Sequence, residues 1–567
     1  NNTGYGVFEG SLVLPASSPF NPFGQAVNVT LNETAPLLGE GYDEAHIDYY
    51  SAVAGVLLKL PEGWQASADA QYGLSVTRYR GTEAVDPNRW QQLVDEGVYN
   101  PLRDTQAFGP PQQFYDKALV FYGAEGSFVT LGDYDTFDAS LRFANAGIRF
   151  PTGAASVILG GDYRYEGLAS YVDTLRYGDG TLTGPPDRWV GRSLQRISVF
   201  GELQAPLVPR RRLPAWIQDI GADLAARYTA SDVAHEANLA PTGAIKVDFS
   251  GGLSLRASYA TSNRFPTPVL SSHVSSSGGA PGSGIVTSEN VFDPKLMQYE
   301  TVQASDAPNP SLKPEAAVTQ TASVIYQRGD AHRVRVSVDF VDTVTSGEET
   351  YLDASQVVDL EDLLPDRVVR AQPAAGGAGA ISAVYTGTFS LAWRHSYEWN
   401  TSFDYTWTDC LGGTLEAYCR WIRFQRYDVE LLPASRPVDE LRNPDGTTAN
   451  GLLRSRMNFG AGWSDRAFGF GVDGHYFHSR VLPMIEWPAQ GGDHVDPYLQ
   501  FDAYVQRDLG AWLPWKSSHY GIRGEARVDN VFDAGPPRYA DDPTGAGVQS
   551  YGDWRRRVYS LSVTVSF

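Results

Sequence analysis

The sequence has little sulfur, a shortage of basic residues and no long hydrophobic segment. It contains 2 cysteines and 3 methionines in 567 residues. It has no stretch of about 18 apolar residues, which excludes a helical membrane span. The 45 Lys and Arg residues are outnumbered by 66 Asp and Glu residues, giving a net charge of -21. Because phosphate binding calls for a basic surface, this balance argues against a nucleic-acid partner.

The residues that are abundant favour strands and turns. Aromatic residues make up 12% of the chain, and there are 57 glycines; both features suit β-structure better than helices. The mean hydropathy of -0.29 is typical of a soluble protein. A transmembrane β-barrel is compatible with that value, because its lipid-facing residues alternate with polar ones and form no hydropathic block.

The last nine residues, YSLSVTVSF, show the alternation most clearly. Successive strand side chains point to opposite faces, so small hydroxyl residues share one face and apolar residues the other. The pattern is what a strand needs between lipid and a wet lumen. We therefore interpret the apolar row as a lipid-facing, barrel-assembly signal that ends on an aromatic residue at a membrane interface: Tyr559, Leu561, Val563, Val565 and Phe567.

Period-2 alternation bounded by turn residues predicts seventeen strands. Charged residues at inward positions of these strands indicate a wide, watered lumen. Short turns on one side alternate with long segments such as 80–136, 263–316 and 409–451 on the other, the arrangement of outer-membrane barrels. The predicted strands are 46–60, 64–79, 137–150, 154–166, 192–206, 217–231, 241–250, 252–262, 317–328, 331–342, 381–393, 396–408, 452–463, 467–479, 497–508, 519–531 and 555–567.

Orientation follows from placing the last strand's end in the periplasm. Counting backward, every long loop is extracellular, so residues 1–45 are predicted to be an extracellular loop segment and 46–567 the barrel. Single-chain bacterial barrels have even strand numbers and two periplasmic termini. The polar, Gly-rich start lacks the features of a signal peptide. The sequence thus predicts that an N-terminal part of the barrel lies on a separate or removed segment.

Four motifs in this order resemble TonB-dependent outer-membrane receptors. The resemblance covers essentially the whole chain. In the second motif, the order of Phe and Arg departs from the usual one. The segments are 14–24 (LPASSPFNPFG), 255–266 (LRASYATSNRFP), 309–315 (NPSLKPE) and 528–537 (VDNVFDAGPP). The resemblance implies an all-β fold, a transmembrane antiparallel barrel of twenty-two strands with an internal plug, of which about seventeen are present here.

The resemblance also implies a location and partners. The location is the outer membrane of a Gram-negative bacterium, in contact with outer-membrane lipid. A second polypeptide or missing N-terminal fragment would carry the plug and the first five strands and would connect the barrel to the TonB system. The function implied is TonB-dependent uptake of an extracellular ligand, such as a siderophore, cobalamin, glycan or peptide. The alternative is a passive channel or a structural component of a surface assembly, without energised transport.

Candidate ligand-binding residues lie in the long loops. Aromatic side chains there can stack on sugars or planar ligands, whereas packing between loops is the competing interpretation. Arg264 and Phe265 follow a strand and can face an entering ligand, or clamp the base of the loop. The loop aromatics singled out are Trp90, Tyr115, Tyr171 and Trp189. Segments 88–98 and 355–363 are predicted to form short loop helices.

The remaining motifs indicate neither an enzyme nor a cofactor. No nucleophile elbow, phosphate-binding loop or zinc spacing occurs. His475 and His478 are three residues apart on one strand and face opposite sides, so no metal site is predicted. Cys410 and Cys419 flank an LGGT turn, which suits a hairpin disulfide in an oxidising compartment. Two unrelated free thiols are the alternative.

Overall fold

The protein folds around one large antiparallel sheet. A computed structural model describes residues 8–33, 43–103, 110–126, 135–168, 171–184, 187–189, 192–232, 237–266, 286–307, 309, 312–372, 377–433, 435–442, 452–510, 521–540, 548–549 and 551–566. Within these residues, hydrogen-bonded registers connect a ladder of seventeen long strands. The all-β prediction and the predicted number of strands are confirmed.

Each strand of the ladder pairs with the next one across a turn or a loop. The first nine are β3 (Asp43–Lys59), β4 (Gln65–Val85), β6 (Asp135–Phe150), β7 (Gly153–Leu168), β10 (Arg192–Pro206), β11 (Ile217–Ser231), β12 (Ala237–Phe249), β13 (Leu253–Arg264) and β16 (Glu315–Arg328). The other eight are β17 (His332–Leu352), β19 (Ile381–Cys410), β20 (Gly413–Glu430), β22 (Ser455–Ser464), β23 (Phe468–Phe477), β26 (Tyr498–Asp508), β27 (Gly521–Asp529) and β28 (Val558–Ser566).

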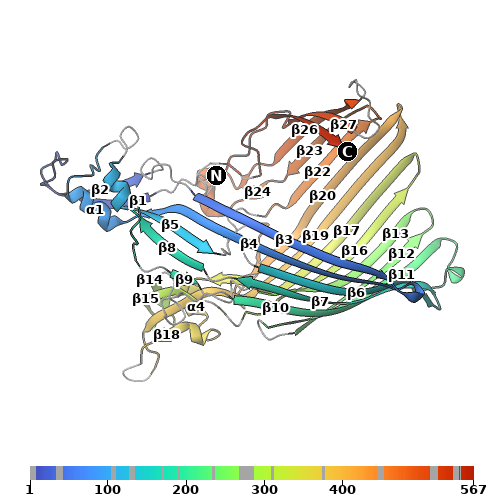
Figure 1. Ribbon diagram of the computed structural model, residues 1–567, viewed down its shortest axis with the longest axis horizontal. Coiled ribbons are helices and arrows are strands. Elements are labelled where there is room, and N and C mark those ends of the chain that lie inside the picture. Colours follow the sequence, from blue (N-terminus) through green and yellow to red (C-terminus); the bar gives the residue numbers. More distant parts are fainter. Residues whose placement is uncertain are drawn as a thin grey trace.

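The two ends of the sheet differ in the length of their connections (Figure 1). At one end, here called the turn end, tight connections such as 60–64, 151–152, 329–331 and 465–467 join neighbouring strands. At the other, the loop end, long segments leave the sheet and form small structures of their own. The predicted separation of short turns from long loops is therefore confirmed.

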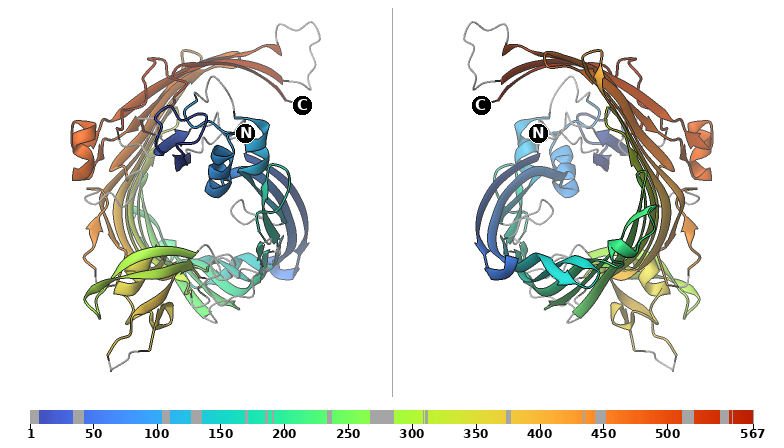
Figure 2. Two further views of the ribbon diagram at one scale, coloured as in Figure 1. Left: turned by 90° about the vertical axis from the view of Figure 1, so that its left-hand side faces the viewer. Right: turned by 90° about the vertical axis from the view of Figure 1, so that its right-hand side faces the viewer.

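The sheet curves into a trough with two separated edges (Figure 2). The hydrogen-bonded ladder ends at β3, which pairs with β4, and at β28, which pairs with β27. Residues 48–60 of the β3 region are exposed with a single exception, and so are residues 559–566 of β28. Exposure on both faces is what an edge strand shows when its second neighbour is absent. In the described residues the seventeen strands do not close a barrel.

β28 carries the alternation that the sequence predicts. Ser560, Ser562 and Thr564 lie opposite Arg527, Glu525 and Arg523 of β27, which gives a polar inner face. The outward side chains are apolar and exposed, with Leu561 87% accessible. Phe567, the last residue of the predicted assembly signal, lies outside the described residues.

A small module covers part of the loop end near β4. The hairpin of β1 (Phe8–Leu14) and β2 (Val27–Glu33) packs against α1 (Pro87–Asp95) and α2 (Gln112–Lys117). α1 begins where the Asp86 side chain accepts hydrogen bonds from two backbone N–H groups, a standard N-cap. The predicted helix near 88–98 is confirmed. Whether residues 1–45 form a separate extracellular segment stays a prediction.

A second module projects from the loop-end parts of β17 and β19. It contains β14 (Val286–Asp293), β15 (Gln298–Asp306), α4 (Ala354–Asp359) and β18 (Val368–Arg370) around one apolar core. β19 has 30 residues, about three times the 9–11 that cross a bilayer. The surplus pairs in parallel with β15 and antiparallel with β18, so it extends well beyond the sheet. α4 confirms the second predicted loop helix.

An ion cluster fastens this module. The Arg370 guanidinium donates to Asp293 at 2.6 Å and to Glu361 at 2.6 Å, and the side chain of Asp293 is fully buried. Hydrogen bonds from Arg370 hold the pKa of both carboxyl groups below their usual values. The charged cluster replaces part of an apolar core, so removing one member leaves buried charges without a partner.

Two errors in the predicted strands cancel, so the predicted total is still correct. Segments 381–393 and 396–408 form the single strand β19, because no turn residue interrupts Arg394 and His395 and both neighbours stay paired through them. Conversely, β20 occupies the first half of the predicted loop 409–451. Residues 411–412 are therefore a tight connection at the turn end.

The predicted disulfide is also wrong. Cys410 lies opposite Gly413 and Cys419 opposite Phe403 in the β19–β20 register, and both thiols are free. The LGGT segment does form a hairpin turn, as predicted. The two cysteines, however, lie several residues apart along the β19–β20 hairpin, out of reach of each other.

Among the described residues, no helix has the length and apolar character needed to cross a membrane.

Replacing Leu561 with Arg tests the lipid-facing assignment of β28. A charge on the lipid face near the middle of a bilayer costs about 2–4 kcal/mol. We expect Leu561→Arg to lower the fraction of heat-modifiable, protease-resistant protein in outer membranes. Ser562→Arg is the matched control, since it projects into the lumen and should assemble normally. Equal assembly of the two variants would contradict the assignment.

Replacing Arg370 with Met tests the ion cluster. Breaking a buried ion pair costs about 3–5 kcal/mol, so Arg370→Met should open the module at lower urea concentration, measured by proteolysis between residues 286 and 384. Because Arg370 lowers the pKa of both acids, the stabilisation is present above their unfolded-state pKa and is lost as pH falls through their folded-state pKa. The difference from wild type should shrink on acidification. Exposed Arg442, changed to Met, is the control.

Candidate ligand-binding site

The concave face of the sheet is lined by paired charges. On β7 and β10, Glu166 accepts from Arg164 at 2.5 Å and from Arg196 at 2.6 Å. One strand further, Arg227 of β11 reaches Asp162 at 2.6 Å. These residues alternate with apolar ones that point to the convex face, such as Leu159 and Ile197. The predicted inward placement of charged side chains thus holds for this wall.

A hollow of about 940 Å³ runs along this wall. Its lining combines the ion pairs with hydroxyl groups and with two phenylalanines, Phe200 and Phe265. Arg196 lies 5.8 Å from the centroid of the Phe265 ring, and Arg227 lies 5.4 Å from that of Phe200. A guanidinium over an aromatic ring is a surface that can hold a planar or polar ligand group.

Arg264 and Phe265 lie at the top of β13, next to this hollow. Arg264 donates to Glu315 of β16 at 2.8 Å and to Glu349 of β17 at 3.0 Å, so it ties three strands together. Phe265 is 7% exposed and contributes to the lining. Phe265 thus lines the hollow together with Arg196, and Arg264 clamps the neighbouring strands. A ligand contact of either predicted residue stays a prediction.

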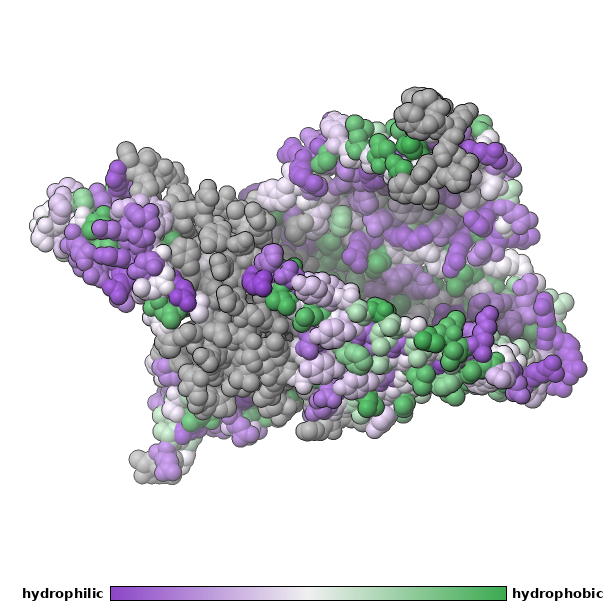
Figure 3. Space-filling view, in the orientation of Figure 1, coloured by the Kyte–Doolittle hydropathy of each residue, from purple (hydrophilic) through white to green (hydrophobic). Residues whose placement is uncertain are grey.

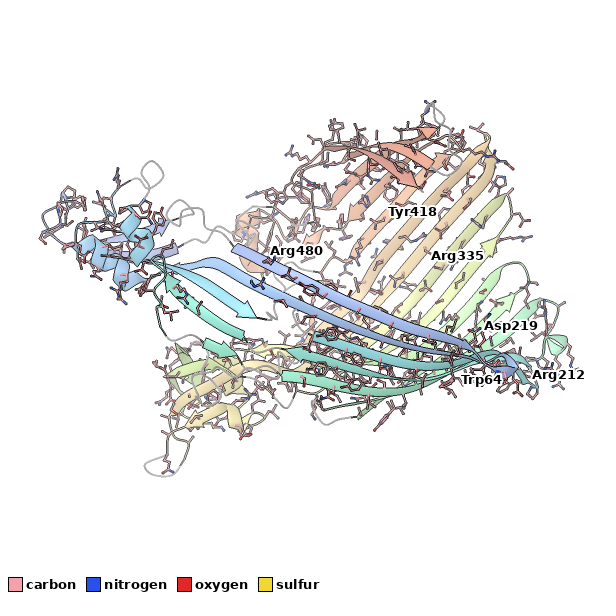
Figure 4. The ribbon with its side chains drawn as sticks, viewed as in Figure 1. Trp64, Arg212, Asp219, Arg335, Tyr418 and Arg480 are labelled. Atoms are coloured by element: carbon pink, nitrogen blue, oxygen red, sulfur yellow. The ribbon has the colours of Figure 1, made fainter. Side chains whose placement is uncertain are left out.

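A second hollow of about 530 Å³ lies on the opposite wall. β17, β19 and β20 contribute Arg335, Asp404, Tyr418 and Arg420, and Arg420 is hydrogen-bonded to Asp404. Figure 4 shows Arg335 and Tyr418 on the wall that is visible between the two edges of the sheet. The space-filling view shows predominantly hydrophilic residues in the same region (Figure 3). Both walls are therefore polar.

Trp90 is not an accessible ligand-binding aromatic, and its prediction is wrong. The side chain is fully buried in the core of the β1–β2 module. It contacts Tyr99 and Phe114 edge to face, with ring centroids 5.6 and 5.9 Å apart. Packing between loops, the competing interpretation, explains it. Tyr115 is half buried at the edge of the same core.

Tyr171 and Trp189 are placed by the backbone alone. β8 (Tyr171–Tyr177) and β9 (Asp187–Trp189) pair so that these two residues lie directly opposite each other. Their side chains lie outside the described part. Together with Tyr115, they stay predictions as ligand contacts.

The sequence analysis missed Asp162, Glu166 and Arg196, although a signal was available. The segment GDYRYEG of β7 alternates charged with aromatic residues at period 2, and the segment 331–342 alternates charged or polar residues with apolar ones in the same way. What the sequence does not contain is the partner of each charge, because the pairs join strands about 30 to 65 residues apart. In the described residues, no group of three or more His, Cys, Asp or Glu side chains is arranged to hold a metal ion.

Glu166→Gln tests the charge pairing of the wall. Glu166 is 6% exposed and holds two guanidinium groups, and hydrogen bonds to charged groups contribute about 1.5–3 kcal/mol each. We expect the variant to lose its heat-modifiable form at lower temperature than wild type. The control is Glu202→Gln, which lies on the same face of β10 and forms no salt bridge in the described residues. An unchanged Glu166→Gln protein would show that the pairs contribute nothing.

Comparison with known proteins agrees with this architecture. The fold is similar to the outer-membrane transporter YddB from Escherichia coli, with TM-score 0.57 and 10% identity over 92% of this chain and 63% of that one. It is also similar to the RagAB peptide transporter, with TM-score 0.53 and 11% identity over 93% and 62%. This chain thus spans less than two thirds of either relative.

The sequence itself decides the family. No curated protein sequence matches the chain. The family model described as "TonB dependent receptor-like, beta-barrel", however, matches residues 2–531. The loop end is accordingly extracellular and the turn end periplasmic. The chain belongs to the β-barrel family of TonB-dependent receptors of the Gram-negative outer membrane.

Proposed function

We propose that the chain is the receptor and channel wall of a system for energised uptake of a bulky or scarce nutrient. The observation that carries the proposal is the trough itself: a seventeen-strand wall, polar on its concave face, with large folded modules at the extracellular end. Such a wall is too wide for side chains to fill and leaves room for a large solute. In this proposal the chain has no catalytic role.

Further strands complete the barrel in this proposal. β3 and β28 each expose a free row of backbone groups, and such groups cannot remain unpaired in hydrocarbon. We propose that a segment carrying a plug and about five strands pairs with both edges. Contact with the TonB system runs through that segment. The proposed ligand is a siderophore, a cobalamin, a glycan or a peptide; RagAB, which has a similar fold, is a peptide transporter.

The separated edges also favour a second candidate function. If β3 and β28 were closed by strands without a plug, or by another surface protein, the trough would act as a passive channel or a structural component. The two candidates differ in energy dependence, because energised uptake needs the proton gradient of the inner membrane and diffusion does not.

Affinity purification of the chain from native outer membranes distinguishes them. We expect the purified material to contain a plug and about five further strands, on a co-purifying polypeptide or on a longer form of the same one, detected by mass spectrometry. Cysteines introduced at Ala54 of β3 and Leu561 of β28 should cross-link to those strands. Cysteines at Val338 of β17, an interior strand, should not, since both neighbours of that strand lie in this chain.

Uptake of complex nutrients by intact cells supplies the functional measurement. A protonophore should abolish the component of uptake that is lost on deletion of the gene. Active transport by this protein is refuted if the purified material contains no plug, or if that component persists without a proton gradient.

A further inference from the structure

One arginine at the extracellular end is buried next to a tyrosine and has no salt bridge to an acidic side chain in the described residues. Arg480 opens the short strand β24 (Arg480–Val481), which pairs with β25 (His494–Val495) between β23 and β26. It is 2% exposed, and Figure 4 shows it toward the loop end. No acidic side chain forms a salt bridge with it, and its Nε and Nη1 atoms have no hydrogen-bond partner in the described residues.

Stacking offsets only part of this burial. The guanidinium carbon lies 4.4 Å from the centroid of the Tyr539 ring, a distance at which the negative face of the ring attracts a cation. The contact does not satisfy the two N–H groups, which lie in the plane of the guanidinium. Buried charges in proteins are normally paired as well as hydrogen-bonded. The surroundings of Arg480 are therefore incomplete as they stand.

Two more unpartnered donors come from the loop between β27 and β28. Gln549 is 1% exposed and its Nε2 has no partner; the Tyr551 hydroxyl has none either. The backbone of this loop is fixed to the Arg480 region, because Gln490 donates to Arg538 and accepts from Ala540. The ring of Tyr551 stacks on Phe477 at the top of β23, with centroids 5.3 Å apart. Tyr551 thus lies at the loop end of β23, where the charge of Arg480 acts on it.

The protonation of Tyr551 suits a donor. Burial raises the pKa of its hydroxyl to about 12, and the charge of Arg480 opposes that shift. Tyr551 therefore keeps its proton at neutral pH. One acceptor, Oε2 of Glu486, also lacks a partner, and Glu486 forms no salt bridge with Arg480. Donors outnumber acceptors in this group of side chains.

We propose that Arg480, Gln549 and Tyr551 form a subsite for a carboxylate or another small oxyanion at the mouth of the receptor. A planar carboxylate matches the fork of a guanidinium, and Glu486 is available to a donor on the same ligand or to an accompanying water. The anion has one of two sources, a free small anion or the anionic group of a larger nutrient. The second source rests on the uptake function proposed above; the binding test does not.

Thermal unfolding of the membrane-extracted protein, with any partner that co-purifies, measures anion binding. The probes are sodium formate and sodium benzoate, each compared with chloride at equal ionic strength. For wild type we expect the Tm to rise and saturate with formate. Arg480→Met should abolish the rise while unfolding in chloride at a temperature no lower than wild type, because it removes a buried unpaired charge. Exposed Arg555, changed to Met, should keep the full response.

A second variant keeps the proposal testable if Arg480→Met fails to assemble. Gln549→Leu removes one donor and should raise the formate concentration at half effect about tenfold, the loss of one hydrogen bond to a charged group. A response to formate alone assigns the subsite to free small anions, and a response to both probes shows that it admits the group of a larger ligand. An equal response in Arg480→Met and wild type, or none beyond chloride in wild type, overturns the proposal.

Discussion

Backbone hydrogen bonding in hydrocarbon is the constraint on which this structure depends. A strand in a bilayer must give every N–H and C=O group a partner on a neighbouring strand. In the described residues, the fifteen interior strands from β4 to β27 meet this requirement through antiparallel registers with a neighbour on each side. Only β3 and β28 do not, and they are also the strands that are exposed on both faces. The backbone groups at these two edges therefore require hydrogen-bond partners from outside the seventeen strands.

Once the strands are paired, the two faces follow from the period of two. Apolar side chains such as Leu159, Ile197 and Leu561 point outward, and Asp162, Arg196 and Arg335 point inward. Inside, the charges pair across strands, as in the Glu166 and Asp162 clusters. Pairing lowers the net field of the wall while keeping it polar. A ligand passing along this face meets alternating charges rather than a surface of one sign.

Beyond the membrane the chain uses ordinary globular packing. The two extracellular modules have apolar cores, capped helices and, in one of them, the buried Arg370 cluster. The region around Arg480 differs, because its donors outnumber its acceptors. The polar groups inside a folded module such as the Arg370 cluster are already paired and support its structure. Buried donors without acceptors, as around Arg480, can instead form hydrogen bonds to a ligand.

The sequence predicted what local alternation controls. The strand number, the separation of turns from loops and the faces of β28 follow from patterns within about ten residues. β20 was missed because its inward charges, among them Glu416 and Arg420, obscure the apolar row. The break within β19 was predicted where only pairing with β17 and β20 shows continuity. Trp90 was misjudged for the same reason: its burial depends on the distant hairpin of residues 8–33.

Hydrogen exchange of backbone amides in native outer membranes tests the central claim most directly. The claim is that the edges of this seventeen-strand wall are paired with further strands in the working receptor. If the edges are paired, amides of β3 and β28 exchange as slowly as those of the interior strands β16 and β17. Fast exchange along both edges, with the interior strands protected, would contradict it.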